Sequence, residues 1–311
     1  MRVGVLGAGA VGCFFGARLA AAGVPVTLVG RQGHVDAITA RGLEIASGGG
    51  VSHLPLPAFT TADSLHDADV VLVTAKSVDT EVVADQLRSA VSPRAVIVSL
   101  QNGVDNAWRL SARLPNPVVP AAVYVSVEMT GPGCLRHNGG GSLVVGRPLH
   151  EGVAADAPGP VLMALAALFV EAGVACRVSN DIRVDLWTKL TANCAYNAIS
   201  ALAQLRYRHI VADDGARDVM RMVAEENAAV AAAEGVPVTL EALRVAVQRI
   251  AEVMPEALSS TAQDLAARRR TEIDDLNGFV VRRGAALGVP TPVNRTLQAL
   301  VALVERSRPP A

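Results

Sequence analysis

The sequence predicts an α/β protein in which an N-terminal domain built on a parallel sheet, residues 1–178, is followed by an all-α domain, residues 179–311. Three observations predict this class. Short apolar strands alternate with helices along the first half of the chain, which is typical of a parallel sheet with helical crossovers. From Ser179 onward no strand pattern remains, and helical segments follow one another to the C-terminus. A length of 311 residues is also enough for two domains with separate cores.

The composition excludes several classes of function. Apolar residues make up 51% of the chain and aromatic residues 3%, so the cores must be built from Ala, Val and Leu. A net charge of −1 argues against a general electrostatic role on nucleic acid or an anionic membrane, and we expect Arg268, Arg269 and Arg270 to lie on a local helix face. The four Cys residues form no CxxC pair, so we expect no metal centre, no disulfide framework and a cytoplasmic location. We expect no signal peptide and no membrane span.

The first predicted strand, residues 2–6, ends in a glycine-rich turn with the pattern GxGxxG. The strand before it and the helix after it, which runs to about residue 22, give this pattern the context that dinucleotide binding requires. Gly7 permits the tight turn, Gly9 lets a pyrophosphate approach the backbone, and Gly12 lets the helix pack on the strand. We therefore predict a Rossmann-type dinucleotide site at Gly7, Ala8, Gly9, Ala10, Val11 and Gly12, with a ligand-free glycine turn as the alternative.

The end of the second strand, residues 26–29, indicates which dinucleotide binds. An NAD site usually places Asp or Glu there for the ribose 2′-hydroxyl, but this chain has Gly30, Arg31 and Gln32. A guanidinium is planar and permanently charged, which suits a 2′-phosphate. We predict NADP(H) as the cofactor, bound through Arg31, the alternative being a solvated surface charge.

Two later strands end in polar residues. Residues 69–75 form an apolar strand that leads into Lys76, and the strand at 95–100 leads into Gln101, Asn102 and Gly103. Open α/β sheets bind ligands at the carboxyl ends of their strands, so we place Lys76 and Asn102 near the nucleotide, although Asn-Gly also suits a plain turn. Residues 42–57 are predicted as a hairpin or a loose surface loop, residues 118–146 as a pair of strands, and residues 174–178 as a closing strand. We expect His137 to be structural.

The second half opens with a long helix that carries a polar face. Lys189, Asn193 and Asn197 follow one another at a spacing of four residues and share that face, while Leu186, Leu190 and Cys194 form an apolar stripe beside it. A solvated polar face is the simple alternative. Ala-rich flanks favour a largely buried helix instead, and a buried Lys needs a partner or a role.

Four separated motifs make the chain resemble the ketopantoate reductase family, the 2-dehydropantoate 2-reductases. These motifs are the glycine turn at 7–12, Gln101-Asn102-Gly103, the helix with Lys189, Asn193 and Asn197, and a pattern that runs from Ser260 through Gln263-Asp264 and residues 271–274 to Asn277-Gly278. The resemblance implies a Rossmann domain, a helical domain and an active site in the cleft between them. It implies Lys189 as general acid and Glu272 as a catalytic residue that binds substrate. Asn193, Asn197 and Ser260 would hold a keto acid, and Lys76 and Asn102 would line the junction of cofactor and substrate.

The resemblance also implies the activity: NADPH-dependent reduction of 2-dehydropantoate to (R)-pantoate in pantothenate biosynthesis. The residues suit it, because a nearby ammonium can stabilise and protonate the oxygen of a carbonyl that receives a hydride. Ala198 and Thr261-Ala262 depart from residues that are common in the family, so a related reductase of another branched or hydroxylated 2-keto acid is the alternative. A non-catalytic NADPH sensor is a more distant one. The expected partner is a small 2-keto acid, with no nucleic acid, membrane or metal; the oligomeric state stays open, a homodimer being one candidate.

Overall fold

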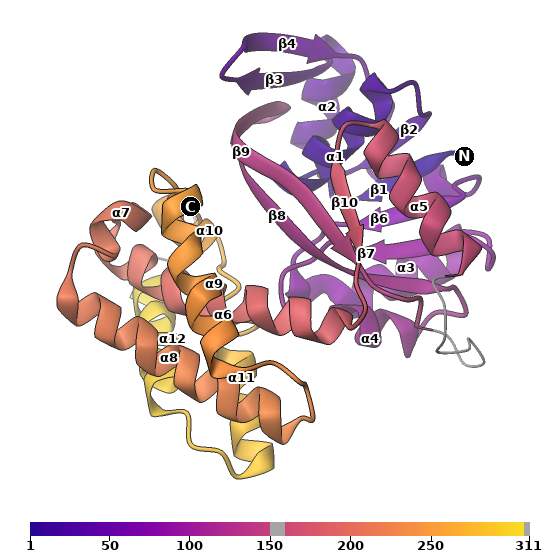
Figure 1. The fold of residues 1–311 in the computed structure, drawn as a ribbon. Helices are drawn as coiled ribbons and strands as arrows, with labels where there is room; N and C mark the ends of the chain where they lie inside the picture. Colours follow the sequence, from indigo (N-terminus) through magenta and orange to yellow (C-terminus); the bar gives the residue numbers. More distant parts are fainter. Residues whose placement is uncertain (150–158, 308–311) are drawn as a thin grey trace. The chain divides into compact units, whose positions relative to one another are not determined.

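The computed structural model describes residues 1–149 and 159–307 of the chain, which divides into two compact units, Met1–Ile182 and Arg183–Ala311. We call them the N-terminal and the C-terminal unit. Residues 150–158 of the predicted first domain and residues 308–311 of the predicted second domain lie outside the described residues. The last strand ends at Val178 and the first helix of the helical part begins at Ile182. Figure 1 shows the sheet in indigo to magenta and the helical part in orange to yellow.

The N-terminal unit is a ten-stranded sheet with helices on both faces. Its order is β4-β3-β9-β8-β7-β6-β1-β2-β5, with β10 beside β9. Along this order the six neighbouring strands β8, β7, β6, β1, β2 and β5 run parallel to one another. Strand β8 pairs antiparallel with β9. The strands are β1 Val3–Leu6, β2 Val26–Val29, β3 Leu43–Ser47, β4 Gly50–Leu54, β5 Ala58–Phe59, β6 Val70–Val73, β7 Val96–Ser99, β8 Val118–Gly131, β9 Cys134–Val145 and β10 Ala175–Val178. The helices are α1 Ala10–Ala21, α2 Gln32–Arg41, α3 Thr80–Ala90, α4 Asn106–Ser111 and α5 Pro160–Glu171, with 3₁₀ turns at Ala62–Leu65 and Ser77–Asp79.

The central strands divide their side chains between two cores. All four residues of β1, β6 and β7 are buried, as expected for parallel strands covered on both faces. Because side chains alternate along a strand, Val70 and Leu72 of β6 join the core under α1 and α5, while Val71 and Val73 join the core under α3 and α4. The carboxyl ends of these strands are therefore held in place by a core on each face of the sheet.

The C-terminal unit is helical. Its helices are α6 Ile182–Ala203, α7 Tyr207–Ile210, α8 Asp214–Ala233, α9 Leu240–Val253, α10 Ser260–Ala266, α11 Asn277–Leu287 and α12 Pro292–Ser307. Its few aromatic residues pack around α6: Trp187 lies 6.0 Å from Phe279 and Tyr196 lies 4.5 Å from Tyr207, measured between ring centroids. The Tyr196 hydroxyl donates to the carbonyl of Val247 at 2.9 Å, which ties α6 to α9.

The predicted fold class is confirmed, but one local expectation is wrong. The arginines 268–270 follow the end of α10 in a turn and do not lie on a helix. Arg268 adopts a left-handed φ of 51°, and the Arg269 N–H returns to the Asp264 carbonyl at 2.8 Å, a pattern that ends helices. Glycine is usual at that position, so an arginine there gives no sequence signal that the helix ends.

Two further observations concern predicted features. His137 packs its ring on Phe14, with centroids 4.8 Å apart, and contacts the Gly140 carbonyl at 3.0 Å through Nε2. Within the described ranges, none of the helices is at once long and apolar enough to cross a membrane.

Candidate functional site

The glycine turn after β1 has a backbone that side chains would block. Gly7 has a φ of +113°, and a Cβ there would lie 2.6 Å from the backbone N of Ala75. A Cβ on Gly12 would lie 2.3 Å from the carbonyl oxygen of Gly7, so α1 packs on the strand at glycine distance. Both glycines are therefore required by the protein itself.

Gly9 differs from its neighbours. A Cβ on Gly9 would meet no protein atom within 4 Å, so the space above it is open. Gly9 is also the N-cap of α1, whose first turn holds no acidic residue and whose first N–H groups have no acceptor within the helix. The Gly9 N–H itself donates to the Gly7 carbonyl. The open space above Gly9, the N–H groups of Ala10 and Val11 and the positive helix end fit a pyrophosphate.

Arg31 lies at the carboxyl end of β2, as the sequence predicts. It is exposed, has an extended backbone with φ −72° and ψ 149°, and is the N-cap of α2. The first turn of α2 carries no acidic side chain. Burial, and secondly the charge of Arg31, lower the pKa of His34, whose Nδ1 accepts a hydrogen bond from the Gly133 N–H at 3.2 Å. The charge of Arg31 and the positive N-terminal end of α2 therefore fit a phosphate.

Thr74 is a site residue that the sequence reasoning missed. It lies at the end of β6, and its hydroxyl donates to the Gly7 carbonyl at 2.6 Å. That same carbonyl accepts the N–H of Gly9 at 2.7 Å. Thr74 therefore holds the glycine turn from a neighbouring strand, through a contact between residues that are 67 positions apart.

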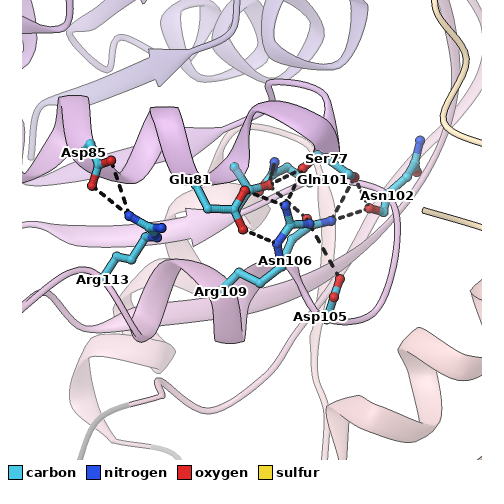
Figure 2. Close-up of polar contacts among 10 residues, drawn as sticks. Ser77, Glu81, Asp85, Gln101, Asn102, Asp105, Asn106, Arg109 and Arg113 are labelled. Atoms are coloured by element: carbon cyan, nitrogen blue, oxygen red, sulfur yellow. Dashed lines mark hydrogen bonds and ion pairs between the residues drawn. The ribbon is translucent and has the colours of Figure 1, made fainter. Parts of the chain in front are cut away.

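The loops after β6 and β7 are joined by a polar network that the sequence reasoning also missed (Figure 2). The Ser77 hydroxyl donates to the Asn102 carbonyl at 2.7 Å. The buried Asn106 side chain bonds both Ser77 Oγ, at 3.0 Å, and the Asn102 carbonyl. Lys76, half-buried, directly precedes Ser77, so the network brings the loops that carry Lys76 and Asn102 together.

In the C-terminal unit, α6 carries Lys189, Asn193 and Asn197 on one helix, as predicted. Lys189 is half-buried. Burial lowers the pKa of Lys189 from its ordinary value to about 8, while the opposing charge of Glu272 raises it. The Glu272 carboxylate therefore acts electrostatically on the Lys189 ammonium, although 83 positions separate the two residues in the chain.

The two asparagines offer amide groups beside this charge. Asn193 is half-buried and Asn197 is 3% exposed. Among the described residues, neither side-chain amide forms a hydrogen bond with the protein. The half-buried Asn193 amide can therefore be reached by a ligand, whereas the Asn197 amide is nearly enclosed.

Ser260 and Glu272 lie at element ends. Ser260 is exposed as the first residue of α10, and the buried Ser259 before it caps the helix by accepting the Ala262 N–H at 3.0 Å. Glu272 is in a turn, where its carbonyl accepts the N–H of Asp275 at 3.0 Å. Of the departures from the family pattern, Ala198 and Ala262 are 0% exposed and Thr261 is 2% exposed, so all three belong to the interior of the helical unit.

The chain is similar to known proteins over almost its whole length. Family models described as "Ketopantoate reductase PanE/ApbA" and "Ketopantoate reductase PanE/ApbA C terminal" match residues 3–149 and 181–305. A 2-dehydropantoate 2-reductase of Halobacterium salinarum is 34% identical, with 98% of this chain and 99% of the relative covered. One of Archaeoglobus fulgidus is 32% identical, with 98% of each covered.

Solved structures extend the comparison. A PanE/ApbA family ketopantoate reductase from Ralstonia eutropha JMP134 is 46% identical, with a TM-score of 0.90 and 99% of each chain covered. A D-mandelate dehydrogenase in a ternary structure with NADH and anilino(oxo)acetate is 25% identical, also with a TM-score of 0.90 and 99% of each chain covered. The matched models and the full-length relatives together show that this chain belongs to the ketopantoate reductase PanE/ApbA family.

Proposed function

We propose that this protein is an NADPH-dependent 2-dehydropantoate 2-reductase, which forms (R)-pantoate for pantothenate synthesis. The observation that carries the proposal is the environment of Lys189: a half-buried ammonium with a lowered pKa, next to Glu272 and on one helix with two amides. The family's curated members are named for the same reduction. In this proposal residues 1–178 bind the cofactor, and residues 179–311 hold the substrate and donate the proton.

Lys189 is assigned the proton transfer. The bound dinucleotide supplies a hydride to the carbonyl carbon of the keto acid. The carbonyl π electrons move to oxygen, and Lys189 Nζ stabilises the growing negative charge and then donates a proton to it. A pKa of about 8 keeps most of the Lys189 population protonated near neutral pH while making it a stronger acid than an ordinary lysine.

The other residues are assigned to binding. Asn193, Asn197 and Ser260 hold the keto acid by hydrogen bonds to its carboxylate and oxygens. Glu272 accepts a hydrogen bond from a substrate hydroxyl and keeps Lys189 charged. On the cofactor side, the glycine turn at residues 7–12 holds the pyrophosphate, and Lys76 and Asn102 line the junction with substrate.

The cofactor is proposed to be NADPH and not NADH. Arg31 at the end of β2 supports this choice, because the position lacks the acid that reads a ribose hydroxyl. The similar D-mandelate dehydrogenase was solved with NADH, so the choice of NADPH for this chain depends on Arg31 and needs its own test. A cytoplasmic location is proposed on the four free thiols, which suit a reducing compartment.

A direct assay tests the activity. The purified protein is mixed with NADPH and, in turn, 2-dehydropantoate and a panel of 2-keto acids with branched, hydroxylated and aromatic side chains. We expect NADPH oxidation with 2-dehydropantoate at a higher kcat/KM than with any other acid. Tight NADPH binding without turnover of any acid would contradict the proposal and favour a cofactor sensor.

The second candidate is a reductase of another 2-keto acid. The similarity to a D-mandelate dehydrogenase bound to anilino(oxo)acetate favours keeping it, because that protein accommodates an aromatic 2-keto acid analogue. A panel in which an aromatic or other branched acid exceeds 2-dehydropantoate in kcat/KM would favour this candidate and leave the assignment of Lys189 intact.

The cofactor proposal has its own variant. Charged hydrogen bonds contribute roughly 1.5–3 kcal/mol, so Arg31→Ala should weaken NADPH binding by about 10- to 100-fold. NADH binding should barely change, because NADH has no 2′-phosphate. Dissociation constants from fluorescence titration decide; equal losses for both cofactors would mean that Arg31 does not bind the phosphate.

A further inference from the structure

One guanidinium lies behind both loops that are assigned to the cofactor. Arg109, on α4, donates to both carboxylate oxygens of Glu81 on α3, at 2.8 and 2.7 Å. It also donates to the side-chain oxygen of Asn106 at 2.9 Å and to the backbone carbonyl of Ser77 at 3.0 Å. Its side chain is 25% exposed. The bidentate ion pair with Glu81 thus fixes the Arg109 guanidinium, whose remaining N–H groups point at Asn106 and at the loop of Ser77 (Figure 2).

Arg109 also decides how the Asn106 amide is turned. A guanidinium only donates, so the amide must present Oδ1 to Arg109. The hydroxyl of Thr80 donates to the same oxygen at 3.0 Å. The Nδ2 end is then directed at two acceptors, Ser77 Oγ and the carbonyl of Asn102. Because Asn106 is 3% exposed, water does not compete for these bonds, and the amide has one satisfied orientation.

The network acts on backbone next to the assigned residues. Ser77 follows Lys76 at the end of β6, and Asn102 lies just beyond the end of β7. The Arg109 hydrogen bond is the largest of the causes that lower the pKa of the Glu81 carboxyl, so the carboxylate stays charged at neutral pH and the fork stays anchored.

We propose that Arg109 is a positioning residue: through Asn106 and Ser77 it holds the Lys76 and Asn102 loops in the arrangement that cofactor binding and hydride transfer need. The inference rests on the proposed function, which assigns Lys76 and Asn102 to the cofactor. Arg109 touches neither cofactor nor substrate in this account. It acts through the amide whose orientation it sets.

The chain offers a matched control one helical turn away. Arg113 pairs with Asp85 of α3 at 3.2 and 3.3 Å, much as Arg109 pairs with Glu81 (Figure 2). Its side chain is 42% exposed, and its recorded side-chain bonds in the described part of the chain go to Asp85 alone. Arg113→Gln therefore removes the same charge and the same kind of pair without removing a hydrogen bond to either loop. The Arg113 charge also lowers the pKa of Glu81, but it is the smallest of the causes of that shift.

The test compares Arg109→Gln with Arg113→Gln in the full chain. Hydrogen–deuterium exchange should rise over residues 74–80 and 100–106 in Arg109→Gln and stay at the wild-type level there in Arg113→Gln. We expect Arg109→Gln to weaken NADPH binding several-fold and to lower kcat by about 10- to 100-fold, since small displacements of positioned groups have effects of that size. Arg109→Lys keeps the charge but not the fork, so it should recover only part of the loss.

Different outcomes separate this inference from the proposed function. If exchange, NADPH affinity and kcat change equally in both variants, or if Arg109→Gln lowers only the melting temperature, Arg109 is structural and the inference is wrong. If the wild-type protein reduces no 2-keto acid, the proposed function fails. Exchange and NADPH affinity then still decide whether Arg109 holds the loops: a rise confined to Arg109→Gln upholds the positioning role, and no rise overturns it.

Discussion

The charge state of Lys189 links its surroundings to a pH dependence. Burial lowers the pKa of Lys189 to about 8, and Glu272 raises it. A general acid works in its protonated form, so kcat should be constant at neutral pH and fall as the pH rises through the pKa. Glu272→Gln removes the charge that raises this pKa, so the decline should begin at a lower pH than in the wild type.

This first prediction is measured as kcat against pH at saturating substrate, between about pH 6 and 10. Asn138, an exposed residue of the N-terminal unit, provides a control position: Asn138→Ala should leave the profile in place. A profile that is identical in the wild type and Glu272→Gln would mean that the carboxylate does not act on the ammonium.

Thr74 is predicted to matter through a single hydroxyl. Its bond to the Gly7 carbonyl, at 2.6 Å, fixes the peptide that leads into the pyrophosphate turn. Thr74→Val keeps the shape and removes the bond, which contributes about 1 kcal/mol, so NADPH should bind roughly fivefold more weakly. Thr74→Ser keeps the hydroxyl and should bind NADPH like the wild type. Fluorescence titration measures both, and equal affinities in the two variants would remove Thr74 from the site.

Residues differ in how far the sequence reveals their roles. The roles of Gly7, Gly9 and Gly12 can be predicted because these residues form one local turn. Those of Lys189 and Asn193 can be predicted because helical spacing places them on one face. That of Thr74 cannot, because its partner Gly7 lies 67 positions away. That of Arg109 cannot, because Glu81 and Ser77 lie 28 and 32 positions away and only the packing of the sheet and its helices brings them to Arg109. The prediction that Lys189 and Glu272 belong to one site was based on the family resemblance and not on their spacing in the chain.

At the scale of elements, α6 rests on a buried polar network. The Asn227 amide donates to Thr191 of α6 at 3.2 Å, and the Asn294 amide donates to Asn227 at 3.1 Å. The Asn277 amide donates to the Cys194 carbonyl of α6 at 3.2 Å and to Asn294 Oδ1 at 3.0 Å. These four polar side chains, from α6, α8, α11 and α12, are fully buried. The network therefore fixes the helix that carries Lys189.

Asn294 is predicted to be the residue of this network with the largest effect on stability. Its backbone N–H and side-chain amide both donate to Glu226, at 2.9 and 2.7 Å, so Asn294→Ala leaves several buried groups unpaired. The free energy of unfolding should fall by roughly 2–4 kcal/mol, whereas Thr296→Ala, which removes one exposed hydroxyl, should change it by less than about 0.5 kcal/mol. Urea unfolding measures both, and equal values would show that the network contributes nothing net.

The elements themselves were predictable where their patterns are strong. The helices Thr80–Ala90 and Leu240–Val253 have clear apolar periodicity, and a proline follows each of them within three residues. The two-residue strand Ala58–Phe59 and the short helix Tyr207–Ile210 left no such pattern. The end of α10 was missed because an arginine occupies the left-handed position.

At the scale of the whole molecule, the residues assigned to the cofactor all belong to Met1–Ile182, and those assigned to the keto acid belong to Arg183–Ala311. The family models match the chain in two stretches, 3–149 and 181–305, that follow the same division. The loss of the strand pattern after Ser179 is the observation behind the predicted boundary at residue 178. Composition did not reveal the long-range contacts that arrange each site, because those depend on sheet order and helix packing.

The proposed reaction assigns charge stabilisation to Lys189 and needs no metal. In the part of the chain that the structure describes, no group of three or more His, Cys, Asp or Glu side chains is placed to hold a metal ion. We expect incubation with a chelator, followed by gel filtration, to leave kcat unchanged. A loss that Mg²⁺ or Zn²⁺ restores would contradict this assignment.

The kcat of Lys189→Ala with NADPH and 2-dehydropantoate tests the central claim most directly. General acid catalysis contributes about 10²–10⁴-fold, so kcat should fall by that factor while NADPH affinity and melting temperature stay near the wild-type values. Lys189→Arg should not restore the rate, because a guanidinium is too weak an acid. If Lys189→Ala keeps most of the wild-type kcat with every 2-keto acid tested, the proton comes from another group and the account of α6 is wrong.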